Sequence, residues 1–322
     1  MNHGTLNLSS YEKDTMTLKI GTRGSRLAIA QSEWVKKEIA ARHPHIHVEL
    51  IRIKTTGDKI IDTPLSKIGG KALFVKEIEG ALLEKAVDLA VHSMKDVPAE
   101  LPEGLMLSAF PEREDPRDAF VSVKHQTIQE LPQRARVGTS SLRRTAQLLT
   151  IRHDLQIVPL RGNVDTRLRK LEEGEIQAII LASAGLKRLG LEKRITHVIP
   201  SDQMLPAIGQ GTLGLEVRRD DELTISLLEF LNHEETEVTV RAERAFLKEL
   251  EGGCQVPIAA FCRFKDGVLH LAGMVAELDG SNTVRDAITG KKAQAEQIGV
   301  TLARKLLDSG ADKILARIYE KA

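Results

Sequence analysis

Cysteine is scarce in this chain, because its 322 residues include only Cys254 and Cys262. Two thiols cannot supply the four ligands of a structural zinc site. Such low cysteine usage is also typical of a reducing compartment. We therefore expect no metal site and a cytoplasmic protein.

Aromatic residues are also few, at 3% of the chain, and 46 basic residues are nearly cancelled by 45 acidic ones. A nucleic-acid-binding surface needs a concentrated basic excess, and a single-strand binder also needs aromatic platforms for the bases. The composition therefore argues against a nucleic-acid partner.

Long apolar runs are missing as well. No stretch approaches the ~18 uninterrupted apolar residues of a membrane span. Residues 1–15 are polar and lack the apolar core of a signal peptide. We expect no membrane partner and no export, with residues 1–15 as a disordered leader.

The chain does contain a regular alternation of strand-like runs and amphipathic helices, and it is long enough for two or three domains. The charged, proline-bearing segment 111–116 separates two such blocks, and we interpret it as a hinge. This alternation predicts two α/β domains. In chain order we predict strands at 17–20, 46–50, 87–91, 136–138, 157–160 and 176–181, and helices at 27–41, 74–83, 139–150 and 163–173.

The C-terminal third has a different pattern. A strong helix over 236–250 is closed by two glycines, and the alternating segment 258–288 has turn signals at 266–267 and 279–280. A final amphipathic helix fits 292–307. These elements predict an antiparallel meander with helices, which is a small α+β domain.

Three stretches look chemical but fit structural roles better. The glycines of 209–214 match the dinucleotide pattern G-x-G-x-x-G, but a strand at 215–217 follows them where that motif requires a helix. Gly70 and Lys71 lack the other residues of a phosphate-binding loop. His43, His45 and His47 flank a proline and enter a strand, which favours surface histidines over a metal site.

A more informative stretch runs from the strand at 136–138 into the next helix. Thr139, Ser140 and Ser141 can cap that helix and leave backbone N–H groups directed outward, which favours anion binding. Arg143 and Arg144 add guanidiniums suited to bidentate contacts with carboxylates. Taken alone, the stretch fits a capped surface helix with solvated arginines equally well.

The same arrangement recurs at other strand ends. Arg161 and Arg167 follow one strand, Arg23 and Ser25 another, and Arg188 a third. Because open α/β sheets bind ligands at the carboxyl ends of their strands, these residues predict a cleft for a ligand with several carboxylates or phosphates.

Two further positions carry reactive groups. Lys95 and Asp96 follow the strand at 87–91, so the carboxylate can project into the cleft, although such a pair can also cap a turn. Cys254 is presented between glycines and Pro257 on a loop, which disfavours the usual role of a buried apolar thiol. Cys262 lies in an alternating strand, where that usual role is expected.

Taken together, these stretches resemble hydroxymethylbilane synthase, also called the porphobilinogen deaminase family. The resemblance covers nearly the whole chain from Thr17 and follows the family's order. It implies joining of four porphobilinogen molecules head to tail, loss of four ammonia molecules and hydrolytic release of hydroxymethylbilane. The matching runs are 23–25, 69–74, 92–96, 138–144, 160–167, 209–211 and 252–254.

The resemblance also implies a fold and a site. We expect two α/β domains like those of periplasmic binding proteins, over 17–112 with 212–230 and over 113–211, with a cleft between them. The small α+β domain spans 231–322. The implied dipyrromethane cofactor is joined by a thioether to Cys254, and Asp96 is the implied catalytic residue.

Further residues and partners follow from the same resemblance. The segment 55–71 is expected to be a mobile cover over the site, and the protein is expected to be a monomer that hands its product to uroporphyrinogen-III synthase. The implied binding residues are Arg23, Ser25, Lys95, Thr139, Ser140, Ser141, Arg143, Arg144, Arg161, Arg167, Arg188, Gln210 and Gly253, with Lys67, Lys71 and Phe74 in or beside the cover.

Two other functions remain open at this point. A non-enzymatic anion-binding module would share the two α/β domains and the arginine-lined cleft. A cysteine hydrolase would use Cys254 with His92 as its base, although no oxyanion-hole motif is evident.

Overall fold

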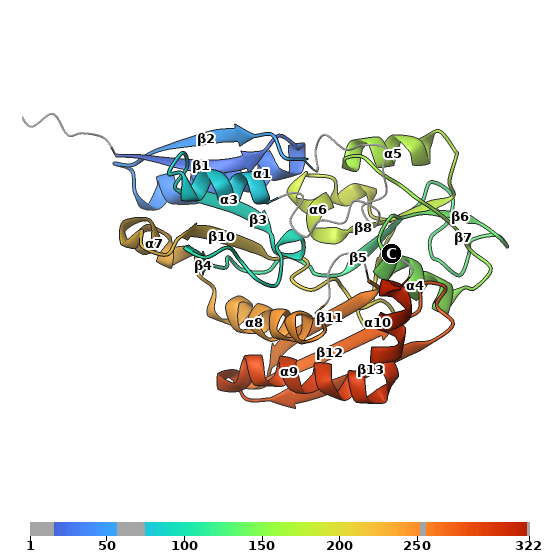
Figure 1. The fold of residues 1–322 in the computed structure, drawn as a ribbon. Helices are drawn as coiled ribbons and strands as arrows, with labels where there is room; N and C mark the ends of the chain where they lie inside the picture. Colours follow the sequence, from blue (N-terminus) through green and yellow to red (C-terminus); the bar gives the residue numbers. More distant parts are fainter. Residues whose placement is uncertain (1–15, 57–74, 252–255, 321–322) are drawn as a thin grey trace, which may run out of the picture.

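The computed structural model describes residues 16–56, 75–251 and 256–320. Lys67, Lys71, Phe74, Gly253 and Cys254 lie outside the described residues, and so does most of the expected cover. The described chain forms two five-stranded sheets and one three-stranded sheet, each flanked by helices (Figure 1). We call the parts built on these sheets the first, second and third domains.

The first sheet has the strand order β2-β1-β3-β10-β4, in which β1 is parallel to β2 and β3 while β10 is antiparallel to its neighbours. Alternate strand residues enter two cores, one under α1 and α7 and the other under α3. The elements are β1 Thr17–Arg23, α1 Arg26–Arg42, β2 His47–Ile53, α3 Lys76–Leu83, β3 Leu89–Ser93, β4 Leu105–Ala109, β10 Leu213–Arg218 and α7 Glu222–Leu228.

The second sheet repeats this arrangement with the order β7-β6-β8-β5-β9, although no internal repeat is evident in the sequence. β6 is parallel to β7 and β8, and β5 is antiparallel to β8 and β9. The elements are β5 Asp118–Val121, β6 Arg136–Gly138, α4 Leu142–Ile151, β7 Gln156–Val158, α5 Val164–Glu172, β8 Ala178–Ala182, α6 Ser183–Arg188 and β9 His197–Ile199.

The third domain confirms the predicted meander. Its strands pair antiparallel in the order β11-β12-β13, and α8 and α9 pack on the sheet around Phe246 and Leu302. The tight turn after β11 has Asp266 and Gly267 at φ 53° and 79°, as an Asp-Gly hairpin requires. The elements are α8 Glu234–Glu249, β11 Ile258–Lys265, β12 Val268–Ala276, β13 Thr283–Gly290, α9 Ala295–Leu306 and α10 Asp312–Tyr319.

Short helical turns complete the described chain. They are the 3-10 turns η2 Met94–Asp96, η3 Glu192–Arg194, η4 Glu229–Leu231 and η5 Lys292–Gln294, and the π turn η6 Leu307–Ala311.

Some element boundaries differ from the prediction. The strand expected at 87–91 runs from Leu89 to Ser93, and the helix expected from Thr139 begins at Leu142 because Ser141 is its N-cap. The strands β4, β5 and β9 and the helices α6, α7 and α10 were not predicted.

The glycines of 209–214 lie where the chain crosses between the first two domains. The first crossing, 110–117, leads from β4 to β5, and the second crossing, 200–212, leads from β9 back to β10. The two run side by side, since the N–H of Glu114 donates to the carbonyl oxygen of Gly211 at 3.2 Å. Gly211 has φ +91°, and a Cβ on it would lie 2.2 Å from the Glu114 carbonyl oxygen. The strand β10 follows, so these glycines allow close backbone packing and do not begin a dinucleotide-binding helix.

Candidate active-site cleft

Asp96 ends the η2 turn that continues directly from β3. The N–H of Met94 in that turn donates to the carbonyl oxygen of Thr212 at 3.0 Å, which holds the strand end against the second crossing. Lys95 and Asp96 are both partly exposed there. The crossing therefore fixes the position at which the first domain presents its lysine and carboxylate.

Cations from the second domain surround this position. Burial lowers the pKa of Lys95, with Asp96 opposing the shift and Arg144 adding to it. Burial likewise lowers the pKa of Arg167 to about 10, with Arg144 adding to the shift and Asp96 opposing it. The charge of Arg161 also lowers the pKa of Arg167. The structure thus brings the predicted residues of two domains into one electrostatic environment.

The hydroxyl groups before α4 have distinct local partners. Ser141 is the helix cap, since its Oγ accepts from the N–H of Arg144 at 3.4 Å. Thr139 accepts from the N–H of Ser141 at 3.2 Å, and Ser140 donates to the carbonyl oxygen of Leu160 at 2.9 Å. These bonds join the ends of two parallel strands and fix the first turn of α4.

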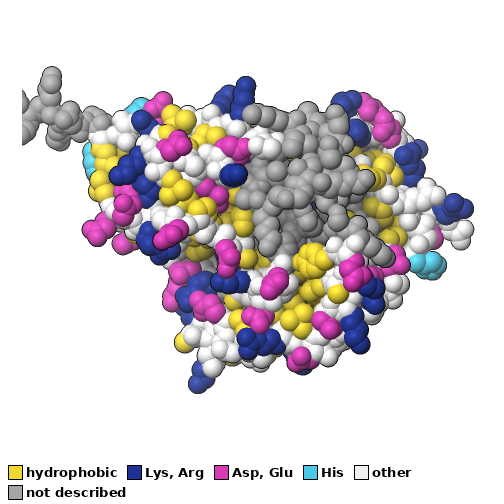
Figure 2. Space-filling model, viewed as in Figure 1, with side chains coloured by type: hydrophobic (Ala, Val, Ile, Leu, Met, Phe, Trp, Pro, Cys, Tyr) yellow, Lys and Arg dark blue, Asp and Glu magenta, His cyan; other side chains and the backbone are white. Residues whose placement is uncertain are grey.

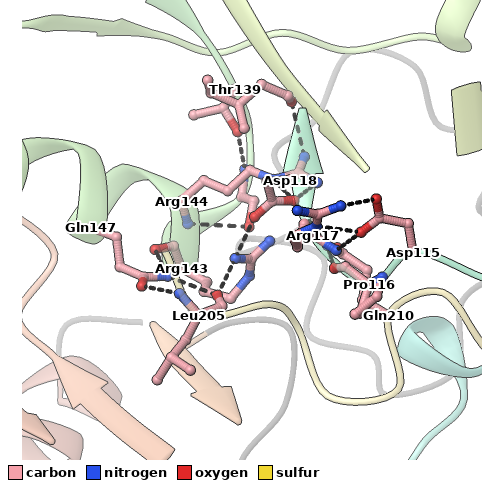
Figure 3. Close-up of polar contacts among 12 residues, drawn as sticks. Asp115, Pro116, Arg117, Asp118, Thr139, Arg143, Arg144, Gln147, Leu205 and Gln210 are labelled. Atoms are coloured by element: carbon pink, nitrogen blue, oxygen red, sulfur yellow. Dashed lines mark hydrogen bonds and ion pairs between the residues drawn. The ribbon is translucent and has the colours of Figure 1, made fainter. Parts of the chain in front are cut away.

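Arg143 and Arg144 are both nearly buried and converge on Asp118 (Figure 3). Arg143 Nη1 donates to Asp118 Oδ2 at 2.7 Å and to the carbonyl oxygen of Leu205 at 2.5 Å. Arg144 Nη2 and Gln210 Nε2 donate to Asp118 Oδ1 at 2.7 and 2.9 Å. The role of Arg143 as a carboxylate ligand stays a prediction, since its described contacts anchor α4 to β5.

Burial acts to raise the pKa of Asp118, but the guanidiniums of Arg143 and Arg144 outweigh it and hold the pKa well below the usual range. Asp118 is therefore an anion at neutral pH. Its charge offsets the repulsion between the two neighbouring arginines.

A small cavity lies where the first domain, the second domain and the crossing meet. Its volume is about 20 Å³, which is room for about one water molecule. The predicted residues Lys95, Arg188 and Gln210 line it, together with Gln31 and Ser93, which were not predicted. Gln31 Nε2 donates to Ser93 Oγ at 2.9 Å.

Arg188 is held at this cavity by the second crossing. Its Nη2 donates to the carbonyl oxygen of Gly211 at 2.6 Å. Burial lowers its pKa to about 10, with Glu114 opposing the shift. The guanidinium therefore stays charged at neutral pH.

The remaining predicted residues lie at the strand ends. Arg23 ends β1, and Ser25 caps α1 by accepting from the N–H of Ala28 at 3.2 Å. Arg161 follows β7, and Arg167 Nε donates to the carbonyl oxygen of Gly162 at 2.9 Å. All four positions match the predicted placement at the carboxyl ends of strands or in the helix turns that follow.

The sequence reasoning missed Asp118 and the environment of His92. An acidic residue opening the apolar run 118–121 was a usable signal for the first, because such an acid must be paired when buried. His92 is buried, and its Nε2 lies 2.8 Å from Glu216 Oε2. The hydrolase alternative pairs His92 with Cys254, which lies outside the described residues.

Surface features agree with the balanced composition. On the face drawn in Figure 2, basic and acidic side chains are interspersed over the described surface. Among residues 16–56, 75–251 and 256–320, no helix is both long and apolar enough to cross a membrane. Over the same residues, no cluster of three or more His, Cys, Asp or Glu side chains could hold a metal ion.

Comparison with known families gives two adjacent matches. Residues 18–226 match the model described as porphobilinogen deaminase, dipyromethane cofactor binding domain. Residues 238–308 match the model described as porphobilinogen deaminase, C-terminal domain.

Curated relatives are similar over almost their whole length. A protein of Trichlorobacter lovleyi named porphobilinogen deaminase is 56% identical over 304 residues, which cover 94% of this chain and 97% of the relative. The Geobacter sulfurreducens protein of the same name is 54% identical, with 94% and 95% covered. That of Carboxydothermus hydrogenoformans is 52% identical, with 94% and 97% covered.

Solved structures give more distant matches. The periplasmic aliphatic sulphonate binding protein SsuA from Escherichia coli has a TM-score of 0.40 and 12% identity, covering 73% of this chain and 70% of that one. A TRAP periplasmic solute binding protein from Desulfovibrio salexigens has a TM-score of 0.43 and 12% identity, covering 69% and 74%.

Proposed function

This chain belongs to the porphobilinogen deaminase family, and on that premise we propose that Asp96 is its catalytic residue and Cys254 carries a dipyrromethane primer. The proposed reaction is the stepwise head-to-tail joining of four porphobilinogen molecules, followed by hydrolytic release of the linear product. Such a reaction places the enzyme among the transferases.

The observation that carries the assignment of Asp96 is its surroundings. One carboxylate of the first domain shares its environment with Lys95 and with Arg144 and Arg167 of the second domain. Asp118 is a second acid in this environment. The lysine and the arginines still outnumber the two acids, which suits a ligand that brings several carboxylates of its own. Porphobilinogen carries an acetate and a propionate group, so each added unit brings two carboxylates.

The residues present fit the cofactor by the same chemistry. Two linked pyrrole units carry four carboxylates, and the proposed ligands are cations and hydroxyls placed at strand ends. When bound, the dipyrromethane supplies the nucleophilic pyrrole carbon that begins the chain. We propose that Arg23, Arg144, Arg161, Arg167 and Arg188 bind carboxylates, with Ser25, Thr139, Ser140, Ser141, Gln210 and Gly253 as further binding residues.

The proposed chemistry needs one group that handles both a cation and a proton. Loss of ammonia from porphobilinogen breaks a carbon–nitrogen bond and leaves a cation, which the Asp96 carboxylate can stabilise. A new carbon–carbon bond then forms, and Asp96 can take the proton that leaves the pyrrole ring. In the release step, water supplies the hydroxyl group of the product.

Arg143 has a positioning role in this proposal. Its bonds to Asp118 and Leu205 hold α4 so that Arg144, one residue further along, is near enough to Lys95 to lower its pKa. The cover residues Lys67, Lys71 and Phe74 are proposed from the resemblance alone, since they lie outside the described residues.

The wider setting is also a proposal. We propose that the protein acts in the cytoplasm as a monomer and hands its product to uroporphyrinogen-III synthase. Light scattering after size-exclusion chromatography tests the monomer, with a mass near the 35.5 kDa of one chain as the expected result.

Intact mass spectrometry with peptide mapping tests the proposed function. We expect an adduct of two linked pyrrole units on the peptide that contains Cys254, and none on a Cys254→Ala variant. Cys262→Ala is the matched control and should keep the adduct, because Cys262 is 2% exposed and burial raises the pKa of its thiol.

The outcome also separates the alternatives. A bare Cys254 that acquires the adduct on incubation with porphobilinogen supports the proposal, because it identifies the preparation as apo-protein. A Cys254 that stays bare with the substrate contradicts it and favours an anion-binding module.

A further inference from the structure

An exposed ion pair joins the first domain to the second at the starts of α1 and α5. Arg26 Nη1 of α1 lies 2.7 Å from Asp165 Oδ1 of α5, so the pair connects the first domain to the second. The two side chains are 56% and 46% exposed. Each residue also lies beside proposed ligands, since Arg26 follows Ser25 and Asp165 lies between Arg161 and Arg167 in the chain.

The position of Arg26 is unfavourable for its own helix. Arg26 is the first residue of α1, where the partial positive charge of the helix N-terminus disfavours a cation. Asp165 lies in the first turn of α5, where the partial positive charge of the helix N-terminus favours its negative charge. A charge that conflicts with its local element indicates a role outside that element.

Packing next to the ion pair brings the same two domains together. Leu27, the neighbour of Arg26, lines the cavity with Gly185 of α6. A Cβ on Gly185 would lie 3.6 Å from Leu27 Cδ2, so the helix start of the first domain touches the second domain there. The ion pair therefore lies beside a direct contact between the two domains, at the cavity that Lys95 and Arg188 line.

We propose that Arg26 and Asp165 are a positioning pair, which holds the ligand-bearing ends of α1 and α5 at the separation that binds porphobilinogen. The pair also neutralises Asp165, which alone would repel a polycarboxylate. This inference rests on the proposed function only for the identity of the substrate. The structural part, that the pair holds two helix starts together, stands by itself.

Steady-state kinetics on the cofactor-loaded enzyme test the positioning role of the pair through three variants and one control. A positioning role predicts that Arg26→Ala and Asp165→Asn both raise KM for porphobilinogen by about 2- to 5-fold, the range that an exposed ion pair supports, with kcat changed less. The charge-reversed double variant Arg26→Asp with Asp165→Arg should return KM to within about twofold of the wild type. These differences should shrink in high salt.

Arg169→Ala is the matched control. Arg169 forms an exposed ion pair at 2.5 Å with Glu173, the C-cap of α5, and its loss removes one positive charge without breaking the pair between the two domains. We expect its KM to equal that of the wild type.

Two results would overturn the proposal. If Arg26→Ala raises KM while Asp165→Asn lowers it, net charge alone acts on the substrate. If neither single variant differs from Arg169→Ala, the pair has no positioning role.

Amide hydrogen exchange separates this proposal from the proposed function. In the absence of substrate, peptides covering 24–35 and 159–170 should exchange faster in both single variants and at the wild-type rate in the charge-reversed variant. Unchanged exchange rates in the single variants contradict the positioning role of the pair, even if the enzyme is active. Faster exchange in a protein that does not use porphobilinogen supports the positioning role and contradicts only the proposed substrate.

Discussion

Asp96 is the residue on which the proposed chemistry depends most. Asp96→Asn keeps the size of the side chain and one acceptor oxygen but removes its charge and its basicity. We expect turnover of the cofactor-loaded variant to fall roughly 10²-fold or more, which is typical of a lost general acid–base group. The rate of product formation and the thermal midpoint are the measurements.

The control for that variant is Glu100→Gln, a nearby exposed acid that pairs with Lys248 at 3.0 Å. It should leave both turnover and stability almost unchanged, because exposed pairs contribute little. Near-normal turnover in a folded, cofactor-loaded Asp96→Asn protein would remove Asp96 from the mechanism.

Glu79 is a second residue whose environment makes a prediction. Burial, followed by the nearby charge of Glu216, raises the pKa of Glu79 from 4.5 to about 7, with His92 opposing the shift. The folded state therefore binds a proton that the unfolded state releases between about pH 4.5 and 7. Through this group, the free energy of unfolding falls as the pH rises across that window, by up to roughly 3 kcal/mol.

Glu79→Gln removes this titration while keeping the shape of the side chain. We expect the variant to be more stable than the wild type at pH 8, with the advantage disappearing towards pH 4.5. Urea unfolding at both pH values measures this. Parallel stability–pH curves for the two proteins would show that Glu79 does not titrate in this range.

The sequence identified residues by their place at strand ends but could not identify their partners. Arg143 and Arg144 follow recognisable cap residues in the sequence. The residue that binds both, Asp118, lies 25 and 26 positions before them, in a strand of opposite direction. Lys95 and Arg167 are likewise far apart in the sequence, so their proximity could not be predicted from it. Only the packing of two domains brings them into one environment.

At the level of elements, the predictions succeeded where the information is local. The strands with parallel neighbours and the long helices have clear periodicity and end signals, as in the Asn163 cap of α5. The strands β4, β5 and β9 are short. β4 pairs with β10, which follows the return crossing, and β5 pairs with β8 and β9 much further along the chain. Their strand structure depends on those distant partners, so no local sequence pattern predicted these strands.

The crossing itself offers a test of the glycine interpretation. Gly211→Ala places a methyl group against the backbone of Glu114 at a φ of +91°. We expect a loss of about 2–4 kcal/mol in the free energy of unfolding, because the strain of a positive φ and a backbone clash add. Chemical denaturation measures the loss.

Gly174→Ala is the matched control, since Gly174 has φ +79° but no atom near the added methyl group. It should lose only the ~1–2 kcal/mol of the conformational strain. Equal losses at the two sites would mean that the crossing strands can separate without cost.

At the scale of the whole molecule, three domains meet at Glu243 of α8. This fully buried carboxylate accepts from Arg113 Nη1 of the first crossing at 2.6 Å and from the N–H of Gly209 in the second crossing at 2.6 Å. It also accepts from the N–H of Cys262 in β11 at 2.8 Å. One side chain therefore ties both crossings to the third domain.

Glu243→Gln tests this junction. The amide keeps one oxygen but loses the charge that Arg113 needs, and Arg113 is only 10% exposed. Leaving a buried guanidinium without its partner typically costs about 3–5 kcal/mol, so we expect a loss of that order in the free energy of unfolding. Glu296→Gln is the control. Glu296 of α9 pairs with Arg241 of α8, the helix that carries Glu243, but it is 51% exposed, and the variant should lose less than about 1 kcal/mol.

The site of the loss matters as much as its size. Because Glu243 touches both crossings, amide exchange in Glu243→Gln should rise together in 110–117, 205–212 and β11, and not in α5 or β2, which lie away from the junction. A loss confined to the third domain would mean that α8 stabilises its own sheet alone. A coordinated rise would show that the cysteine-bearing third domain and the cleft between the first two domains are coupled through one carboxylate.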